Sequence, residues 1–347
     1  MFGLDILNFR ESERQFLQAC LRIWGQTMSR EHVDHSAIVR FADERVNLKQ
    51  EDVKAHREQA NRLRDRLETY LDDHQDFELR KMMLSGSLAK GTALKSLNDI
   101  DIACYVSSDS APEKIGDLIV WLADKLRKAF PNFQPEQVKP QTYSVTVSFR
   151  GSGLDVDVVP ILYDGDPKWR GYLVSQDTGD KLMTSIPMHL DFIRKRKTKN
   201  DKHFAQVIRL IKHWARLHKA GDQEFRLKSF MIELIMAHLA DKGTPLADYP
   251  SAIAAFFNYI AAGEFDDAIV FDDYYDPSMC TGSQPIRIWD PVNHENNVAS
   301  LYTASNKAKL IDAADDAGDA VAAALRATTK GETVRHWQRV LGPSFDA

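Results

Sequence analysis

Two aspartates two positions apart, Asp99 and Asp101, lie in a segment rich in strand-forming residues. Side chains alternate between the two faces of a strand, so both carboxylates are expected on the same face. Like charges placed together repel each other and favour a partner of opposite charge, of which a divalent cation is the simplest. An Asp-x-Asp pair is also common on surface strands, so the pair alone is weak evidence and its surroundings must decide.

A third carboxylate comes from a later segment, where Asp155 and Asp157 share one face of an expected strand at 154–162. Either aspartate could complete a metal site with the first pair. Three carboxylates from adjacent strands can hold two magnesium ions about 4 Å apart. Ligands that are all oxygen favour magnesium or manganese over zinc.

A phosphate cradle is predicted about a dozen residues before the aspartate pair. Gly86 and Ser87 follow Leu84-Ser85 and precede a short helical stretch. Glycine lets a phosphate approach the backbone, and a serine hydroxyl and a helix N-terminus both donate hydrogen bonds to it. A cradle beside paired carboxylates suits a metal-bound nucleoside triphosphate.

The elements that must position these residues divide the chain into two parts. Alternating and helical patterns predict strands at 100–106, 143–149 and 154–162, the last closed early by Pro160, and helices at 11–28, 51–72, 112–130, 204–219, 227–240, 251–262 and 307–327. This order predicts an α+β fold: a mixed sheet with helices in residues 1–185 and a helical lobe in residues 186–347. The long amphipathic helix at 51–72 is a candidate brace between the lobes.

Composition narrows the function classes further. The net charge is −5, from 45 basic and 50 acidic residues, and gives no support to strong standing nucleic-acid binding. One basic run, residues 194–199, is either a solvated helix end or a contact for phosphates. Three scattered cysteines fit neither a disulfide framework nor a zinc site. With no signal peptide and no apolar stretch long enough for a membrane span, a cytoplasmic protein without membrane contact is expected.

The same motifs resemble a known superfamily. Gly86-Ser87-Leu88-Ala89-Lys90-Gly91-Thr92 followed by Asp99-Ile100-Asp101 resembles the active-site signature of polymerase-β-type nucleotidyltransferases. Asp157-Val158-Val159-Pro160 resembles the strand of that superfamily that carries the third carboxylate. There the aspartate directly before Val-Val-Pro is the ligand, so the resemblance favours Asp157 over Asp155.

The resemblance continues through the expected helical lobe to the C-terminus. Segments 208–214, 228–234 and 289–298 and the ending from Trp337 to Phe345 are similar to oligoadenylate synthases and their bacterial relatives. Together they identify the chain as a member of the CD-NTases, relatives of cyclic GMP-AMP synthase that make cyclic oligonucleotides in phage defence. The resemblance implies a polymerase-β-like nucleotidyltransferase core with a C-terminal helical lobe.

The resemblance also implies roles. Asp99, Asp101 and Asp157 would hold two Mg²⁺ ions, with Mn²⁺ as a substitute, while Gly86, Ser87, Lys212 and Ser229 would contact the triphosphate. Phe230 matches the position where the family often stacks an aromatic ring on a base. A solvated helix lysine remains the alternative for Lys212, and ordinary core packing remains the alternative for Phe230.

The substrates implied by the resemblance would be ATP and possibly other NTPs, and the product would be a cyclic trinucleotide or dinucleotide containing adenine. A HORMA-domain activator and an AAA+ ATPase regulator are known for some relatives.

Two other functions stay open from the sequence. One is an enzyme that extends RNA or transfers a nucleotide to a small molecule or protein, which the acidic balance disfavours. The other is an inactive nucleotide-binding scaffold, which usually lacks a carboxylate or the serine, whereas this chain has all of them. Base choice, ring size and the 2′-5′ or 3′-5′ linkage are not encoded in any motif that we can place.

Overall fold

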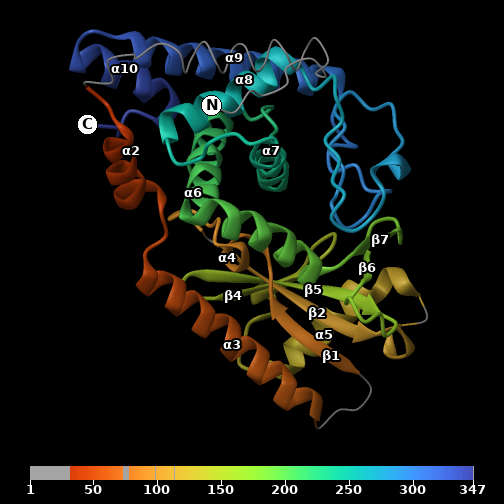
Figure 1. The fold of residues 1–347 in the computed structure, drawn as a ribbon. Helices are drawn as coiled ribbons and strands as arrows, with labels where there is room; N and C mark the ends of the chain where they lie inside the picture. The colour runs from red at the N-terminus through yellow and green to blue at the C-terminus, as the bar shows by residue number, and fades with distance from the viewer. Residues whose placement is uncertain (1–31, 73–77, 98, 113, 347) are drawn as a thin grey trace.

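The computed structural model describes residues 32–72, 78–97, 99–112 and 114–346 (Figure 1). The helix expected at 11–28 lies outside these residues. A mixed sheet with covering helices forms one part of the molecule, and a bundle of helices forms the other (Figure 1). None of the helices in the described ranges combines the length and the apolar character that crossing a membrane requires.

The sheet brings the two expected aspartate strands together as direct neighbours. Its strands are β1 (Leu79–Leu84), β2 (Asp99–Ser107), β3 (Val138–Pro140), β4 (Val145–Phe149), β5 (Leu154–Tyr163), β6 (Gly171–Val174) and β7 (Lys181–Thr184). The main order is β1-β2-β5-β4-β3, and β6 pairs with both β5 and β7. Strands β2 and β5 run parallel and all other pairs are antiparallel, so the mixed sheet is confirmed.

Two helices, α3 (Gln50–Asp72) and α5 (Leu118–Ala129), pack on one face of this sheet. Leu63 and Leu67 of α3 are fully buried there with Ile100 of β2 and Val156 of β5. Burial of such side chains stabilises the fold by about 1.5–3 kcal/mol each. The core therefore anchors β2 and β5 from behind.

The remaining helices, except the short α4 (Gly86–Lys90) of the sheet part, form the second part. They are α2 (His35–Phe41), α6 (Ile186–Gly221), α7 (Ser229–Asp241), α8 (Tyr249–Gly263), α9 (Ala304–Arg326) and α10 (Lys330–Leu341). Trp214 of α6 and Trp337 of α10 are among the largest fully buried side chains of their common core. Helix α6 bends at Asp201, where φ is 50° and ψ is −148°. Its first half lies over the sheet and its second half enters the bundle (Figure 1).

The expected brace, the helix at 51–72, packs on the sheet part, and the chain just before it packs on the helical part. Residues of α2 and of the π-helical turn Ala42–Val46 are buried in the helical core, whereas α3 is buried in the sheet core. The boundary proposed between residues 185 and 186 coincides with the start of α6. Because α6 also contacts α4, the division into two domains stays a prediction.

Several expected boundaries were wrong. Helix α5 begins at Leu118 and not at residue 112, because a 3₁₀ turn, Ile115–Asp117, comes first. The non-helical Asp201 divides α6, so the helix expected at 204–219 corresponds to its second half, whereas its first half, from Ile186, was not among the expected helices. Pro160 does not close β5, which continues to Tyr163. Strand β4 pairs with β5 only as far as Val158. Pro160 lies beyond this pairing, so its missing N–H costs no hydrogen bond to β4.

Candidate active site

The three predicted carboxylates come together at one end of the paired strands β2 and β5. The parallel register places Asp101 opposite Asp157 and Asp99 opposite Asp155. One ligand atom each from Asp99, Asp101 and Asp157 lies within 4.8 Å of the other two. Asp155 is not part of this group. The arrangement brings three oxygen donors to the spacing of a metal site.

The electrostatics of this group favour a bound cation. Burial, reinforced by the charges of Asp99 and Asp157, raises the pKa of Asp101 to about 6, although Lys90 and Lys212 oppose the change. Burial also raises the pKa of Asp157, against a hydrogen bond of 2.5 Å that the Thr146 hydroxyl donates to its Oδ1. Carboxylates that repel one another in a partly dry site fit a divalent metal ion, which would hold them in the charged form.

The predicted cradle lies directly against this group. Gly86 has a φ of +63°, and a β-carbon added there would lie 1.7 Å from Oδ2 of Asp101. The backbone N–H of Ser85 donates to the carbonyl of Asp101 at 2.8 Å. Gly86 begins α4, in which Ser87 is half-buried. Only glycine fits this contact, because it has no β-carbon and adopts positive φ without strain.

Lys212 lies in a buried charged cluster that also contains Lys90, Thr92 and Glu233. Its Nζ donates to Glu233 Oε1 at 2.7 Å and to Thr92 Oγ1 at 3.0 Å, and Lys90 Nζ donates to Glu233 Oε2 at 2.8 Å. Burial alone would raise the pKa of Glu233, but the two lysines outweigh it and lower the pKa to about 2. Lys212 is only 5% exposed. The alternative that it is a solvated helix lysine is therefore wrong.

Ser229 and Phe230 occupy the first turn of α7. Ser229 is exposed, and Phe230 is half-buried against the helical core. Lys90 Nζ lies 4.6 Å from the centre of the Phe230 ring, and the ring of His189 meets it edge-on at 5.4 Å. Phe230 therefore packs against the core and also borders the lysine that faces Asp101.

Two residues of this site were not singled out from the sequence. Glu233 is the only acidic residue within the α7 segment Ser229–Ala240, and a lone carboxylate among apolar residues signals a buried pair. Thr146 lies opposite Asp157 in the β4–β5 register, which follows from strand pairing and has no local signal. The pattern of α7 could have pointed to Glu233, whereas only the tertiary structure identifies Thr146.

The basic run at 194–199 contains a solvated helix end and a buried ion pair. Arg194 and Lys195 are exposed, as a solvated helix end would be, and both pair with Asp191. Arg196 is buried between Asp241 and Asp273, at 2.5 and 2.8 Å. Its guanidinium is a structural ion pair and is not available to phosphates.

The comparisons with known proteins show the family of this chain. Residues 35–200 match the model of the Second Messenger Oligonucleotide or Dinucleotide Synthetase domain. The chain is 60% identical over 319 residues to a cyclic AMP-AMP-AMP synthase of Escherichia coli strain MS 115-1, covering 92% of this chain and 99% of that protein. A CBASS oligonucleotide cyclase, CdnC, of Escherichia coli strain KTE188 is 30% identical, with 88% and 96% covered.

Solved structures show the same relationship. The structure of CdnC from E. coli MS115-1 with ATP has a TM-score of 0.85 at 59% identity and covers 91% of this chain and all (100%) of that chain. The Vibrio cholerae DncV 3′-deoxy GTP form has a TM-score of 0.66 at 12% identity, with 90% and 96% covered. The second likeness shows the fold alone.

Proposed function

The chain belongs to the CD-NTase family, metal-dependent nucleotidyltransferases that make cyclic oligonucleotides in anti-phage defence, and from this premise we propose that its product is cyclic AMP-AMP-AMP made from ATP. The observation that carries the proposal is the 60% identity over nearly the whole length of a cyclic AMP-AMP-AMP synthase. The polymerase-β-like fold matches that of the E. coli CdnC structure with ATP.

We assign Asp99, Asp101 and Asp157 as the catalytic carboxylates and ligands of two Mg²⁺ ions, for which Mn²⁺ can substitute. Their proximity and the raised pKa of Asp101 support this assignment. Metal bound there supplies Lewis-acid activation of a ribose hydroxyl and charge neutralisation at the triphosphate. The hydroxyl attacks the α-phosphate in line and pyrophosphate leaves.

The remaining roles belong to the protein's own side chains. Gly86 and Ser87 receive the triphosphate on backbone and hydroxyl donors at the start of α4. Lys212 acts with Lys90 as fixed positive charge behind the triphosphate, because Glu233 holds both ammonium groups beside Asp101. These donors are set before substrate arrives, so no reorganisation is needed during the reaction.

At the first turn of α7, Ser229 contacts the triphosphate and Phe230 stacks on the base of the bound nucleotide. The exposure of Ser229 leaves its hydroxyl accessible, and the half-buried position of Phe230 leaves part of its ring open. These two assignments rest on the family pattern and on the closeness of Lys90 to the Phe230 ring.

A HORMA-domain protein is the partner that we propose as an activator. The E. coli MS115-1 CdnC structure was solved as a complex with a HORMA-domain protein, and that chain is 58% identical to this one. An AAA+ ATPase regulator and the cytoplasmic location stay predictions from the sequence.

The test is incubation of the protein with the four NTPs and Mg²⁺, with and without a HORMA-domain partner, followed by phosphatase treatment and mass spectrometry. We expect a phosphatase-resistant product with the mass of a cyclic adenylate trimer. The Asp99→Asn/Asp101→Asn double variant, with its fold verified by circular dichroism, should form none. Linear oligomers or extended RNA would contradict the proposal, and so would full turnover by the double variant.

A further inference from the structure

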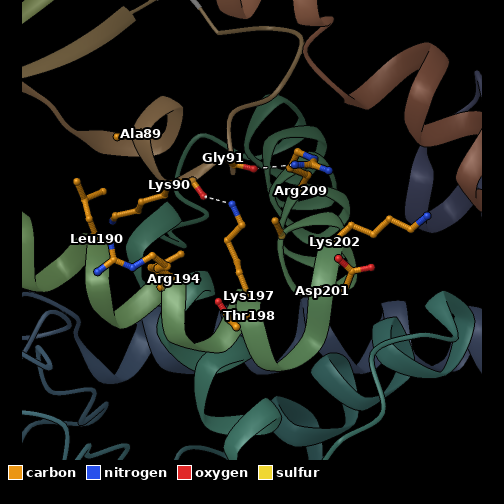
Figure 2. A pocket seen from close by; sticks show the side chains of 12 residues that line it. Ala89, Lys90, Gly91, Leu190, Arg194, Lys197, Thr198, Asp201, Lys202 and Arg209 are labelled. Atoms are coloured by element: carbon orange, nitrogen blue, oxygen red, sulfur yellow. Dashed lines mark hydrogen bonds between the residues drawn. The ribbon is translucent and has the colours of Figure 1, made fainter.

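A cavity of about 620 Å³ opens between the C-terminal end of α4 and the bend of α6. Figure 2 shows its lining, which comes from the two halves of α6 and from residues 89–91. Five of the lining residues are basic, and a single one is acidic: Lys90, Arg194, Lys197, Lys202 and Arg209, against Asp201. The volume falls within the usual range of small-ligand sites.

Two of these cations meet only neutral acceptors among the described residues. Lys197 Nζ donates to the backbone carbonyl of Lys90 at 3.3 Å (Figure 2). The Arg209 guanidinium donates to the Gly91 carbonyl and to the side-chain oxygens of Asn47 and Gln206. Neither forms an ion pair within the ranges that the structure describes, so the cavity wall carries an excess of positive charge.

Burial disfavours the charged forms of Lys197 and Arg209. It lowers the pKa of the Lys197 ammonium, with a further contribution from the charge of Arg209. It likewise lowers the pKa of Arg209, against weaker opposing effects from Tyr249 and Asp43. Partly buried cations that lack a counter-charge are stabilised by any anion that enters the cavity.

The rest of the lining is suited to an apolar group. Leu190, Ile193 and Ala205 from α6 and Ala89 from α4 border the same cavity. A ligand that fits must therefore combine anionic groups with an apolar or planar portion. The strained backbone of Asp201 at the bend is a second sign, because residues held at such angles concentrate at ligand sites.

The cavity and the carboxylate group both border Lys90, whose ammonium pairs with Glu233, and are otherwise formed by different residues. Gly86, which meets Asp101, begins α4, whereas the cavity lies at Lys90 and Gly91, where α4 ends. A five-residue helix is about 7.5 Å long, and its body lies between the two places. The cations of the cavity belong to the protein itself, so a ligand there needs no metal ion.

We propose that the cavity between α4 and the bend of α6 is a second, metal-independent binding site for a phosphorylated small molecule of nucleotide size. Arg209 and Lys197 bind the phosphate groups from the inner wall, and Arg194 and Lys202 complete the site at its exposed rim. The apolar side chains of α6 receive the ring portion.

The test uses metal-free conditions, in which the three carboxylates repel phosphates and the proposed site keeps its charge. Binding of ADP and of inorganic tripolyphosphate is measured by calorimetry in EDTA. The variant Lys197→Gln/Lys202→Gln removes two charges from the cavity. Its matched control, Lys195→Gln/Lys199→Gln, removes two exposed charges from the same helix outside the lining.

We expect affinity for ADP to fall at least about 10-fold in the first variant and to stay unchanged in the control, since each charge-assisted hydrogen bond contributes roughly this much. ADP should bind more tightly than tripolyphosphate, because the apolar wall receives its ring portion. Absence of binding of both probes to the wild-type protein would overturn the proposal, as would equal weakening in both variants. Loss of duplex DNA binding in the first variant with unchanged ADP affinity would overturn it in favour of a nucleic-acid surface.

Discussion

Gly86 and Asp101 are in contact so close that a β-carbon on Gly86 would lie 1.7 Å from a carboxylate oxygen of Asp101. Gly86→Ala must therefore push the carboxylate away or distort the turn, whose φ of +63° already disfavours alanine. We expect pyrophosphate release to fall at least about 100-fold, the loss typical of misplacing a catalytic group by 1 Å. Gly151→Ala, where an added β-carbon meets nothing within 4 Å, is the control and should keep full activity.

In the metal-free protein, ionisation of Asp101 should lower the free energy of unfolding as the pH rises. Its pKa is raised from 3.8 to about 6, so the folded state binds more protons than the unfolded state between these values, and stability falls across this window. Asp101→Asn should therefore have a higher melting temperature than the wild type at pH 8 in EDTA. The difference should shrink below pH 6 and vanish near pH 4. Equal melting temperatures at pH 8 would contradict the prediction.

Mg²⁺ should reverse the order of the melting temperatures of the wild type and Asp101→Asn at pH 8. A cation bound by the three carboxylates stabilises the folded wild-type protein by mass action, and Asp101→Asn removes one ligand. We expect millimolar Mg²⁺ to raise the wild-type melting temperature at pH 8 by several degrees and to change that of the variant much less. A shift of the same size in both proteins would place the bound ion elsewhere.

Glu233→Gln should destabilise the protein strongly. Glu233 is 2% exposed and is the common counter-charge of Lys90 and Lys212. Removing one partner of a buried ion pair leaves the other uncompensated and costs about 3 kcal/mol. Urea unfolding should show this loss at pH 7, and the control Glu264→Gln, an exposed side chain at the end of α8, should change stability little.

The same carboxylate predicts an acid limit of stability. The pKa of Glu233 is lowered to about 2 from 4.5, so its contribution is present above pH 4.5 and is lost as the pH falls toward 2. Glu233→Gln should lose this dependence. Parallel stability curves for the wild type and the variant between pH 5 and pH 3 would argue against the pairing.

Thr146→Val should weaken catalysis through Asp157. The Thr146 hydroxyl hydrogen bond stabilises the charged carboxylate, and its loss leaves burial to raise the pKa further. Loss of a group that orients a metal ligand typically reduces activity about 10-fold or more. We expect activity to recover partly as pH or Mg²⁺ rises. Thr142→Val, whose hydroxyl binds the exposed Asp177, should behave as wild type in the same pH profile.

The local patterns of the sequence determined most of what the site is made of. Strand periodicity placed Asp99 and Asp101 on one face, because side chains alternate whatever the neighbouring strands are. Gly86 and Ser87 predicted a tight turn suited to phosphate, and the positive φ of Gly86 agrees with the turn, because the conformation that glycine permits is a property of the residue itself. The family resemblance came from the same segments and extended to the helical lobe.

Tertiary structure decided which of these residues meet. Asp155 and Asp157 share a strand face, and the parallel register with β2 places Asp157 opposite Asp101, where it joins the cluster. Glu233 accepts a hydrogen bond from Thr92, which is 141 residues away in the sequence. It also pairs with Lys212, which from the sequence alone could have been a solvated lysine. Such contacts depend on how strands and helices pack across the chain, and no local preference encodes a pairing between segments so distant in sequence.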